Sequence, residues 1–283
     1  TQLWQLDATH LAQLIRDKQV SCEQVLDEHL GRLADVNPHL NAVVLTLDEE
    51  ARARAREADK LVATGAVLGP LHGVPVTTKV NTDQAGCPTD NGVAAFRDVI
   101  ATEDSPTVAN LRKSGAIVIG RTNTPAFSMR WFTENDHHGD TLNPWDAART
   151  PGGSSGGASS SVAAGIAPIG QGNDIAGSVR YPAYCCGLVG LRPTFGRAPT
   201  FNPFLGDAGR PITAQLMAVQ GPLTRTVRDA RIAMEVMSMG DSRDPRWVDV
   251  PFVGAPLHSP IRVAIVENPA GRGVSQEVRE AVK

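Results

Sequence analysis

Residues 151–197 read PGGSSGGASSSVAAGIAPIGQGNDIAGSVRYPAYCCGLVGLRPTFGR, and this stretch carries most of the information about fold and chemistry. Its first ten residues have the composition of a flexible Gly/Ser linker. A linker lies between polar or Pro-rich segments, whereas this one runs directly into SVAAGIAPIG at 161–170, which must be buried. Small residues permit close backbone approach, and N–H groups between Gly and Ser can face a developing negative charge. We therefore predict a packed and chemically active segment.

Within this stretch, Gly152, Ser154 and Gly156 match the pattern G-x-S-x-G. In α/β-hydrolases this pattern places a nucleophilic serine on a sharp turn that directly follows a strand. The preceding residues, NPWDAARTP, contain Pro144 and Pro151 and do not predict a strand. The context argues against such an elbow, which we keep as an alternative mechanism with Ser154 as the nucleophile.

A second serine follows a glycine in GNDIAGSVRYPAYCCGLVGLRPT at 172–194, where the backbone must turn tightly. Consecutive N–H groups at such a turn can converge on an oxyanion. Taken alone, however, a buried serine that is hydrogen-bonded to backbone is the commoner outcome. The candidate oxyanion donors are the backbone N–H groups of Ile175, Ala176, Gly177 and Ser178.

Outside this stretch, helical and extended patterns alternate along the chain, which predicts an α/β sheet covered on both faces. We expect Ser21, Asp48, Ser105 and Ser275 to cap helices, Thr226 and Asp229 to form a capping box, and Pro38 to end a helix. The expected helices cover 8–18, 21–38, 48–62, 105–114, 226–240 and the residues after 275. The expected strands cover 41–46, 73–80, 116–119 and 261–266.

The charge balance excludes some classes of partner. The chain has 27 Lys+Arg and 30 Asp+Glu, a net charge of −3, which does not predict a nucleic acid or a membrane surface as partner. The longest apolar runs are too short to span a bilayer. Four cysteines without paired spacing suit a reducing cytoplasm rather than a disulfide framework or a zinc site. These are Cys22, Cys87, Cys185 and Cys186.

The polar loop NDHHGD at 135–140 contains four residues of metal-ligating type. Their spacing matches no standard ligand set, so we expect no metal there. The loop is better placed at the border of a substrate entrance. The four residues are Asp136, His137, His138 and Asp140.

Together these motifs resemble the amidase signature family. Residues 151–197 look like its signature, GPLHGVPVTTKVN resembles its lysine segment, and GRTNTPAF and NPWDAARTPGGSSGG fall where the family has similar sequence. The resemblance implies one α/β domain with a large mixed β-sheet flanked by helices on both faces. It also implies an amidohydrolase that uses no metal or organic cofactor, with Ser178 as nucleophile, Ser154 as a proton relay held by a cis peptide bond, and Lys79 as base.

The resemblance assigns supporting roles as well. Asp174 and Arg180 match positions that brace the nucleophile loop, and Ser155 matches a hydroxyl that supports the triad. Two positions depart from the family pattern: Val80 replaces the usual Asp after the lysine, and Ala176 replaces the first of two glycines. Ala176 keeps its N–H, so the oxyanion donors survive if its φ is negative. Residues expected to line a substrate pocket are Ser128, Met129, Trp131 and Phe132.

The expected organisation is one amidase signature domain over 1–283, incomplete at its C-terminus because the last helix meets no stop signal before Lys283. It comprises a helical segment at 1–65, a catalytic core at 66–240 and a surface connection at 241–260. The expected substrate is a small-molecule carboxylic amide, with esters and a homodimer left open. Two alternatives remain: a glutaminase-type amidotransferase subunit working in a complex, and a non-catalytic protein that keeps the fold.

Overall fold

The computed structural model describes residues 2–209, 211–256 and 259–283. The described chain separates into two units, one extending to Val250 and the other covering Pro251–Lys283. The first unit contains the sheet and the serine-rich segment. None of the described helices combines the length and the apolar character needed to cross a membrane.

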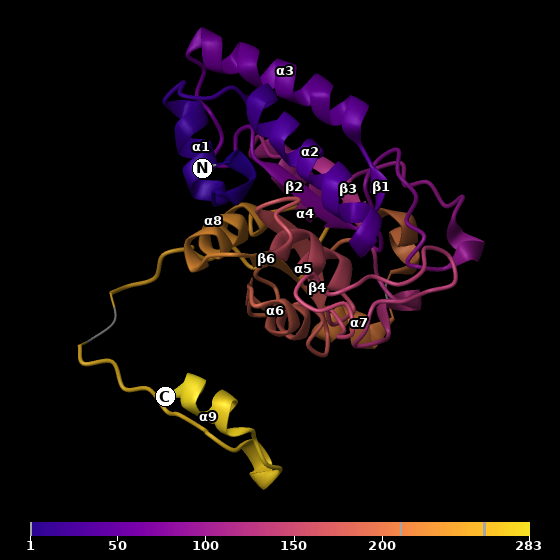
Figure 1. Ribbon diagram of the computed structural model, residues 1–283, viewed down its shortest axis with the longest axis vertical. Coiled ribbons are helices and arrows are strands. Elements are labelled where there is room, and N and C mark those ends of the chain that lie inside the picture. The colour runs from indigo at the N-terminus through magenta and orange to yellow at the C-terminus, as the bar shows by residue number, and fades with distance from the viewer. Residues whose placement is uncertain (1, 210, 257–258) are drawn as a thin grey trace. The chain divides into compact units, whose positions relative to one another are not determined.

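A six-stranded mixed sheet forms the centre of the first unit (Figure 1), with the strand order β1-β3-β2-β4-β6-β5. The three central strands β3, β2 and β4 are parallel, whereas β1 pairs antiparallel with β3, and β6 pairs antiparallel with both β4 and β5. The strands are β1 (Val43–Thr46), β2 (Pro75–Lys79), β3 (Ile117–Thr122), β4 (Ile169–Asp174), β5 (Val189–Gly190) and β6 (Val219–Thr224).

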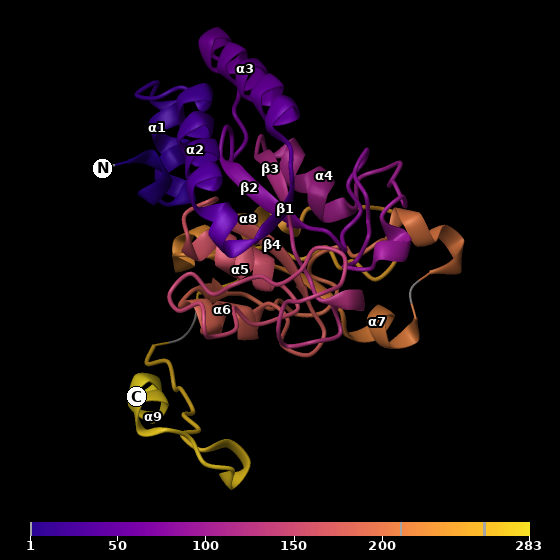
Figure 2. The same ribbon diagram turned by 45° about the vertical axis from the view of Figure 1, so that its right-hand side comes forward.

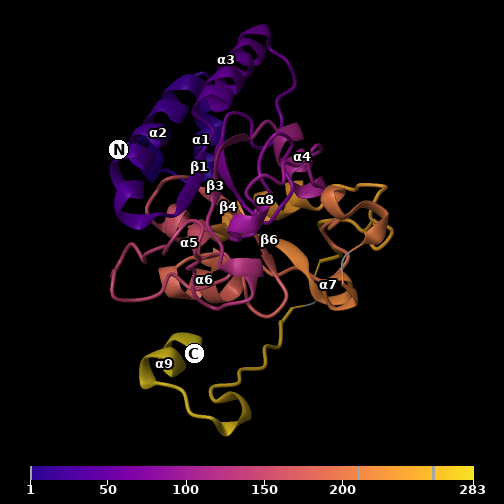
Figure 3. The same ribbon diagram turned by 90° about the vertical axis from the view of Figure 1, so that its right-hand side faces the viewer.

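Helices lie on both sides of this sheet (Figures 1, 2 and 3), which confirms the predicted fold class. The α-helices are α1 (Ala8–Arg16), α2 (Cys22–Leu40), α3 (Asp48–Thr64), α4 (Pro106–Lys113), α5 (Gly156–Ala163), α6 (Arg180–Cys186), α7 (Ile212–Met217), α8 (Val227–Met237) and α9 (Gln276–Val282). Short 3-10 helices cover Leu3–Gln5, Ala94–Phe96, Ala126–Ser128, Pro203–Ala208 and Pro269–Gly271.

Helix starts follow the predicted caps in part. Ser21 and Gln24 form a reciprocal capping box at the start of α2, and Ser275 caps α9. The expectation that Pro38 ends its helix was wrong: α2 runs through Pro38 to Leu40 and stops at Asn41, which adopts the left-handed conformation at φ 49°. The cap predicted at Asp48 was also wrong, because Asp48 is the first helical residue of α3 and Leu47 is the N-cap. Ser105 occupies the N-cap position of α4 as predicted, although its side chain forms no cap hydrogen bond.

The capping box predicted for α8 is only half formed, and the reason is tertiary. Thr226 accepts a hydrogen bond from the Asp229 N–H, but the Asp229 carboxylate does not return to the cap. It instead accepts the N–H groups of Ala8 and Thr9, each at 2.9 Å, at the N-terminus of α1. A carboxylate at a helix N-terminus satisfies unpaired donors and complements the helix dipole. Asp229 thereby ties α1 to α8.

Helix α5 packs closely on the sheet because β4 presents glycines to it. A Cβ added at Gly170 would lie 3.2 Å from side-chain atoms of Ala158 and Val162, and one added at Gly172 would lie 2.8 Å from Ser155 Oγ. Only glycine permits this approach without displacing α5. The small residues of the serine-rich stretch are therefore packing residues of a buried helix, as the sequence predicts, and not a linker.

The second unit contains one predicted element and lacks another. Helix α9 forms after Ser275, but residues 261–266, expected as a strand, have no strand structure and their side chains are exposed. A strand requires a neighbour to accept its backbone hydrogen bonds, and no strand lies within the described residues of this unit. The prediction of a strand at 261–266 was therefore wrong.

Candidate active site

Lys79 is the last residue of β2, and its side chain is completely buried. Its Nζ lies 2.7 Å from Ser154 Oγ, 3.2 Å from Ser155 Oγ and 3.0 Å from Asn173 Oδ1. The Lys79 N–H also donates to Gln171 Oε1 at 2.9 Å, which fixes the end of the strand. The amine is therefore surrounded by neutral oxygen atoms.

Burial strongly favours the neutral form of this amine. The pKa of Lys79 falls from its ordinary value of 10.5 to about 7, because burial lowers it by more than the charge of Asp174 raises it. Much of the amine is therefore unprotonated at neutral pH. An unprotonated lysine in contact with a hydroxyl has the properties required of a general base.

Ser154 and Ser155 lie at the start of α5. The peptide bond between Gly153 and Ser154 is cis, as the resemblance implied. Two hydrogen bonds fix the segment: the Thr124 hydroxyl donates to the Ser154 carbonyl at 2.9 Å, and the Ser155 N–H donates to the Ser178 carbonyl at 3.2 Å. The second contact joins the relay segment directly to the residue predicted as nucleophile.

Ser178 lies in the loop after β4 and is 9% exposed. Its side chain and that of Ser154 line the same cavity, although no hydrogen bond joins the two hydroxyls among the described residues. Proton transfer between them therefore requires a side-chain rotation or an intervening group. Lys79, Ser154 and Ser155 are thus in direct contact, and Ser178 lines the same cavity as Ser154.

The backbone N–H groups of the Ser178 loop are not equivalent. Ala176 is not among the residues with positive φ, whereas Gly177 has φ 109°. The Gly177 N–H donates to Asp174 Oδ1 at 2.8 Å and is therefore occupied. Within the described chain, no acceptor is found for the N–H groups of Ile175, Ala176 or Ser178.

Asp174 braces this loop. Its carboxylate accepts the N–H groups of Gly177 and Val179 and forms a two-point contact with the Arg180 guanidinium, with both N···O distances at 3.0 Å. Burial acts to raise the pKa of Asp174, but Arg180 and the two N–H groups outweigh it and hold the pKa below its usual value. Arg192 lies 3.7 Å from the same carboxylate. The charge of Asp174 is therefore largely neutralised.

The peptide unit between Ala176 and Gly177 is hydrogen-bonded at both its carbonyl and its N–H. The Trp131 indole Nε1 donates to the Ala176 carbonyl at 3.2 Å, while the N–H of that peptide unit, on Gly177, is bound by Asp174. The Trp131 ring also packs against Tyr181, with ring centroids 5.9 Å apart. Trp131 therefore contacts the nucleophile loop from outside.

A cavity of about 490 Å³ lies over the two serines. This volume is within the usual range for a small-molecule site. Of the four predicted pocket residues, Ser128 and Met129 line it, whereas Trp131 and Phe132 do not. Its apolar lining residues include Phe127, Met129, Ile175, Phe201 and Leu205, and its polar ones include Asn81, Asn91, Ser154, Asn173 and Ser178.

Two amides in the site were not singled out from the sequence. Asn81 and Asn173 pair with each other through both amide groups, and Asn173 also contacts Lys79. The available signals were weak: Asn81 comes two residues after Lys79, and Asn173 directly precedes Asp174. The only indication in the sequence that these two asparagines belong to the site is their position next to predicted catalytic or supporting residues.

A second fully buried cation lies on the neighbouring strand β3. Arg121 donates to Gln84 Oε1 at 3.0 Å and to the Thr82 carbonyl at 2.7 Å. Burial lowers the pKa of Arg121 to about 10, while nearby acidic groups such as Asp90 and Asp83 act in the opposite direction. This guanidinium therefore remains charged and holds the loop that follows β2.

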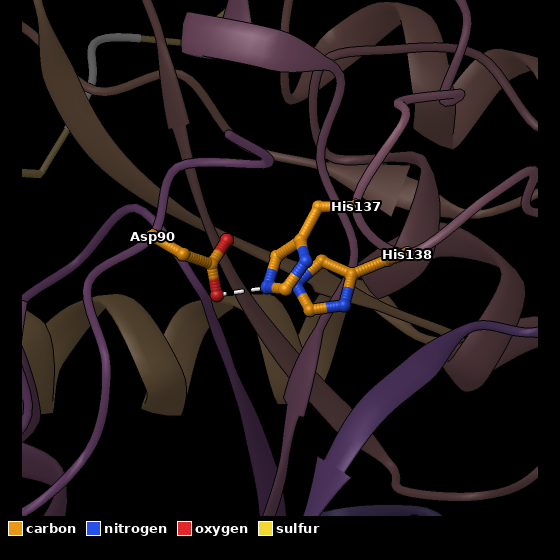
Figure 4. A group of neighbouring side chains, drawn as sticks. All are labelled: Asp90, His137 and His138. Carbon is orange, nitrogen blue, oxygen red and sulfur yellow. Dashed lines mark hydrogen bonds and ion pairs between the residues drawn. The ribbon is translucent and has the colours of Figure 1, made fainter. Parts of the chain in front are cut away.

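The histidines of the NDHHGD loop lie beside Asp90 (Figure 4). His138 Nε2 is 3.1 Å from Asp90 Oδ2, and the ring of His137 packs on that of His138 with centroids 4.0 Å apart. The second Asp90 oxygen accepts the Gly92 N–H at 2.7 Å. Both carboxylate oxygens thus have protein partners, and a hydrogen bond between the imidazole and the carboxylate accounts for the cluster. His138 and Asp90 join two loops beside the cavity.

Comparisons with known proteins identify relatives along the whole chain. The sequence profile of the family described as Amidase matches residues 24–283. An indoleacetamide hydrolase from Bradyrhizobium diazoefficiens is 52% identical over 281 residues, which cover 99% of this chain and 53% of that protein. A glutamyl-tRNA(Gln) amidotransferase subunit from Picosynechococcus is 35% identical, over 96% of this chain and 56% of that protein.

The fold gives the same result. The crystal structure of a bacterial aryl acylamidase of the amidase signature family superposes with a TM-score of 0.80 and 33% sequence identity, over 87% of this chain and 50% of that one. The chain thus spans about half the length of the relatives that it matches. Because the family profile covers most of the sequence and the sheet superposes on that of a solved member, the chain belongs to the amidase signature family.

Proposed function

We propose that the protein is an amidohydrolase that cleaves a small-molecule carboxylic amide through an acyl-enzyme on Ser178. The observation that carries the proposal is the position of Lys79 Nζ, completely buried and 2.7 Å from Ser154 Oγ, at a cavity that Ser154 and Ser178 both line. A serine hydroxyl is a weak nucleophile and needs a base to accept its proton. A buried amine with a pKa of about 7 can supply that base near neutral pH.

In the proposed reaction, unprotonated Lys79 accepts the proton of Ser154, which accepts the proton of Ser178. The Ser178 oxygen then bonds to the amide carbon, and the carbonyl oxygen becomes an oxyanion. The N–H groups of Ile175, Ala176 and Ser178 bind this oxyanion, while the Gly177 N–H serves Asp174. Ser154 returns a proton to the leaving nitrogen as the C–N bond breaks, and water then hydrolyses the ester.

We propose an amide of an aromatic acid as the substrate. The apolar part of the cavity is formed largely by Phe127, Met129, Ile175, Phe201 and Leu205, which suits a flat apolar acyl group more than a charged one. The relative with 52% identity is named for indoleacetamide, which is the amide of an acid that carries an aromatic ring. Indole-3-acetamide is therefore the first substrate to test.

The amidotransferase alternative has weaker support. The relative of that kind is 35% identical, against 52% for the indoleacetamide hydrolase. A protein that releases ammonia from glutamine would favour a polar acyl pocket. Glutamine is accordingly the matched competitor substrate, because its amide is equally small and its acyl group is charged.

We also propose a cytoplasmic location. All four cysteines are free, and Cys22, Cys87 and Cys186 are buried. Burial raises the pKa of each of these three thiols, which makes them poor nucleophiles. Free buried thiols are the normal state in a reducing compartment.

The proposed function is tested by treating the full natural chain with a fluorophosphonate and mapping the adduct by mass spectrometry. We expect labelling of Ser178, its loss in Ser178→Ala, and unchanged labelling in Ser238→Ala, which removes an exposed hydroxyl on another element. We also expect ammonia release from indole-3-acetamide and little from glutamine. An adduct on Ser154 would support the elbow mechanism instead, and a well-folded chain without adduct would refute the hydrolase.

A further inference from the structure

The two asparagines near Lys79 form a closed pair of hydrogen bonds. Asn173 Nδ2 donates to Asn81 Oδ1 at 2.8 Å, and Asn81 Nδ2 donates to Asn173 Oδ1 at 3.2 Å. The same Asn173 oxygen accepts the hydrogen bond of Lys79 Nζ at 3.0 Å. Asn173 is therefore the only amide side chain in contact with the amine among the described residues.

A longer chain of hydrogen bonds is consistent with the orientation of this amide. Asn81 Nδ2 also donates to Ser128 Oγ at 2.8 Å, and Ser128 Oγ donates to Asn91 Oδ1 at 3.0 Å. In this arrangement the Asn81 nitrogen faces Ser128, and the Asn81 oxygen accepts from Asn173. The Asn173 nitrogen thus faces Asn81, and the Asn173 oxygen faces Lys79.

This orientation matters for a neutral amine, which has two N–H groups and one lone pair. The Asn173 oxygen can only accept, so it takes one N–H, and Ser155 Oγ at 3.2 Å is placed to take the other. The lone pair is then left for the Ser154 hydroxyl at 2.7 Å. If Asn173 were turned over, its NH₂ group would instead donate to that lone pair and block the base.

We propose that Asn173, oriented by Asn81, is a positioning residue that directs the lone pair of Lys79 toward Ser154 and holds the amine without placing a counter-charge on it. The inference rests on the proposed function of Lys79 as base. A carboxylate at this place would bind the amine as an ion pair and keep it protonated. A neutral amide accepts the same hydrogen bond and leaves the amine free to lose its proton.

The other groups around Lys79 agree with this role. From α5 it meets the neutral hydroxyls of Ser154 and Ser155, and from β4 the neutral side chains of Gln171 and Asn173. Asp174 is the acidic group whose field reaches it, and Arg180 and Arg192 pair with that carboxylate. Among the described residues, Asn173 is thus the amide in contact with the Lys79 amine, and replacing its NH₂ group by oxygen would place a negative charge beside that amine.

The test is Asn173→Asp, which keeps the shape and replaces the NH₂ group by an oxygen. An opposite charge at hydrogen-bond distance raises the pKa of an amine by about 1–3 units. The titration of Lys79 can be followed directly by ¹³C NMR of protein labelled at the lysine ε-carbon, with Lys79→Met used to assign the signal. We expect the midpoint to move upward by that amount, and the pH at which kcat/KM is half-maximal to move with it.

Because about half of the wild-type amine is unprotonated at pH 7, this shift corresponds to a loss of about 5- to 500-fold in kcat/KM at that pH, which should be recovered as the pH is raised. The matched control is Gln19→Glu, which makes the same chemical change at an exposed position and should move neither midpoint. Asn173→Ala removes the acceptor without adding charge. It should lower kcat with little change in KM, and its Lys79 midpoint should not rise.

A Lys79 midpoint that is unchanged in a folded Asn173→Asp variant overturns the inference, as does an Asn173→Ala variant with full kcat. These outcomes are distinct from failure of the proposed function, which would appear as a wild-type chain without Ser178 adduct or amide hydrolysis. The NMR titration does not depend on turnover and therefore reads the contact between Asn173 and Lys79 in either case.

Discussion

Two fully buried cations lie on neighbouring strands of the same sheet and on opposite faces of it. Thr78 pairs with Arg121 and Lys79 pairs with Thr122, and because side chains alternate along a strand, Lys79 and Arg121 point to different sides. Lys79 contacts Ser154 and Ser155 just before α5, whereas Arg121 contacts the loop after β2. Because both side chains are fully buried, comparing them shows how the neighbouring groups affect the charge of a buried cation.

Burial disfavours both charges, but the two outcomes differ. The pKa of Lys79 falls from 10.5 to about 7, where loss of its proton is easy, whereas the pKa of Arg121 falls from 12.5 to about 10, which leaves the guanidinium charged. Arg121 has main-chain and amide oxygens at its guanidinium and several acidic groups nearby, while Asp174, the acidic neighbour of Lys79, is neutralised by arginines. Arg121, on one side of the sheet, thus remains a charged structural residue, whereas Lys79, on the other side, can lose its proton near neutral pH.

The largest expected effect is that of Lys79→Met on activity. Loss of a general base typically lowers the rate by about 10²- to 10⁴-fold, so kcat/KM should fall in that range. Stability should not fall with it, because a buried amine is replaced by an apolar side chain of similar size. Parallel kinetics and thermal unfolding check both parts. A strongly destabilised Lys79→Met variant would mean that the amine is structural, like Arg121.

Arg121→Met should show the reverse pattern. It leaves the Thr82 carbonyl buried without its donor, whereas Gln84 Oε1 keeps the hydrogen bond from the Thr78 hydroxyl at 2.8 Å. An orphaned buried acceptor costs about 1–3 kcal/mol, so we expect the free energy of unfolding to drop by that amount in urea titrations. The pH midpoint of kcat/KM should stay in place in the folded variant. A shift of that midpoint would show that the two cations are coupled across the sheet.

The pH dependence of stability gives a third contrast. Because the pKa of Lys79 is lower in the folded than in the unfolded chain, unfolding takes up a proton between about pH 7 and 10.5. Raising the pH through this window makes that uptake harder, so the wild type should gain stability relative to Lys79→Met. Urea midpoints of both proteins across this range provide the measurement. A constant difference between them would contradict a lowered pKa.

The smallest expected effect is that of Gln84→Glu. Gln84 Nε2 is buried without a partner in the described chain, while its Oε1 accepts from Arg121. Replacing the NH₂ group by oxygen removes the unpaired donor and adds a counter-charge to a group that stays protonated. We expect a gain of about 1 kcal/mol in unfolding free energy. The same amide-to-carboxylate exchange at Asn173 should lower kcat/KM. If Gln84→Glu lowered kcat/KM to the same extent, the proposed difference between the surroundings of Lys79 and Arg121 would be contradicted.

Much of the fold could be predicted from local patterns. The helices α1 to α4 and the strands β1 to β3 lie where periodicity indicates, although Asp48 does not cap α3 and Pro38 does not end α2. Strand β4 gives no such signal, because IGQGND has no apolar alternation, and its glycines are explained only by the approach of α5. Strand β6 contains Gly221 and Pro222, which argue against a strand in isolation. Both segments are strands because of their tertiary contacts and not because of their local sequence.

The site divides in the same way. Lys79, Ser154 and Ser178 could be singled out because long motifs surround them. Asn81 and Asn173 could not, because the role of an amide depends on its partner, and these two lie 92 residues apart in the chain. Arg121 directly follows a run of buried residues, so its position in the sequence predicts only the end of a strand. Its role is defined by the loop that folds over it.

The peptide unit between Ala176 and Gly177 has one further consequence. A peptide group has a single dipole, and here both of its ends are held, the carbonyl by Trp131 and the N–H by Asp174. Polar groups that must turn to meet a developing charge add reorganisation free energy to every catalytic cycle. In the proposed reaction this peptide unit does not need to turn. Its orientation is set once, when the chain folds, and each substrate molecule meets an electrostatic field that is already in place.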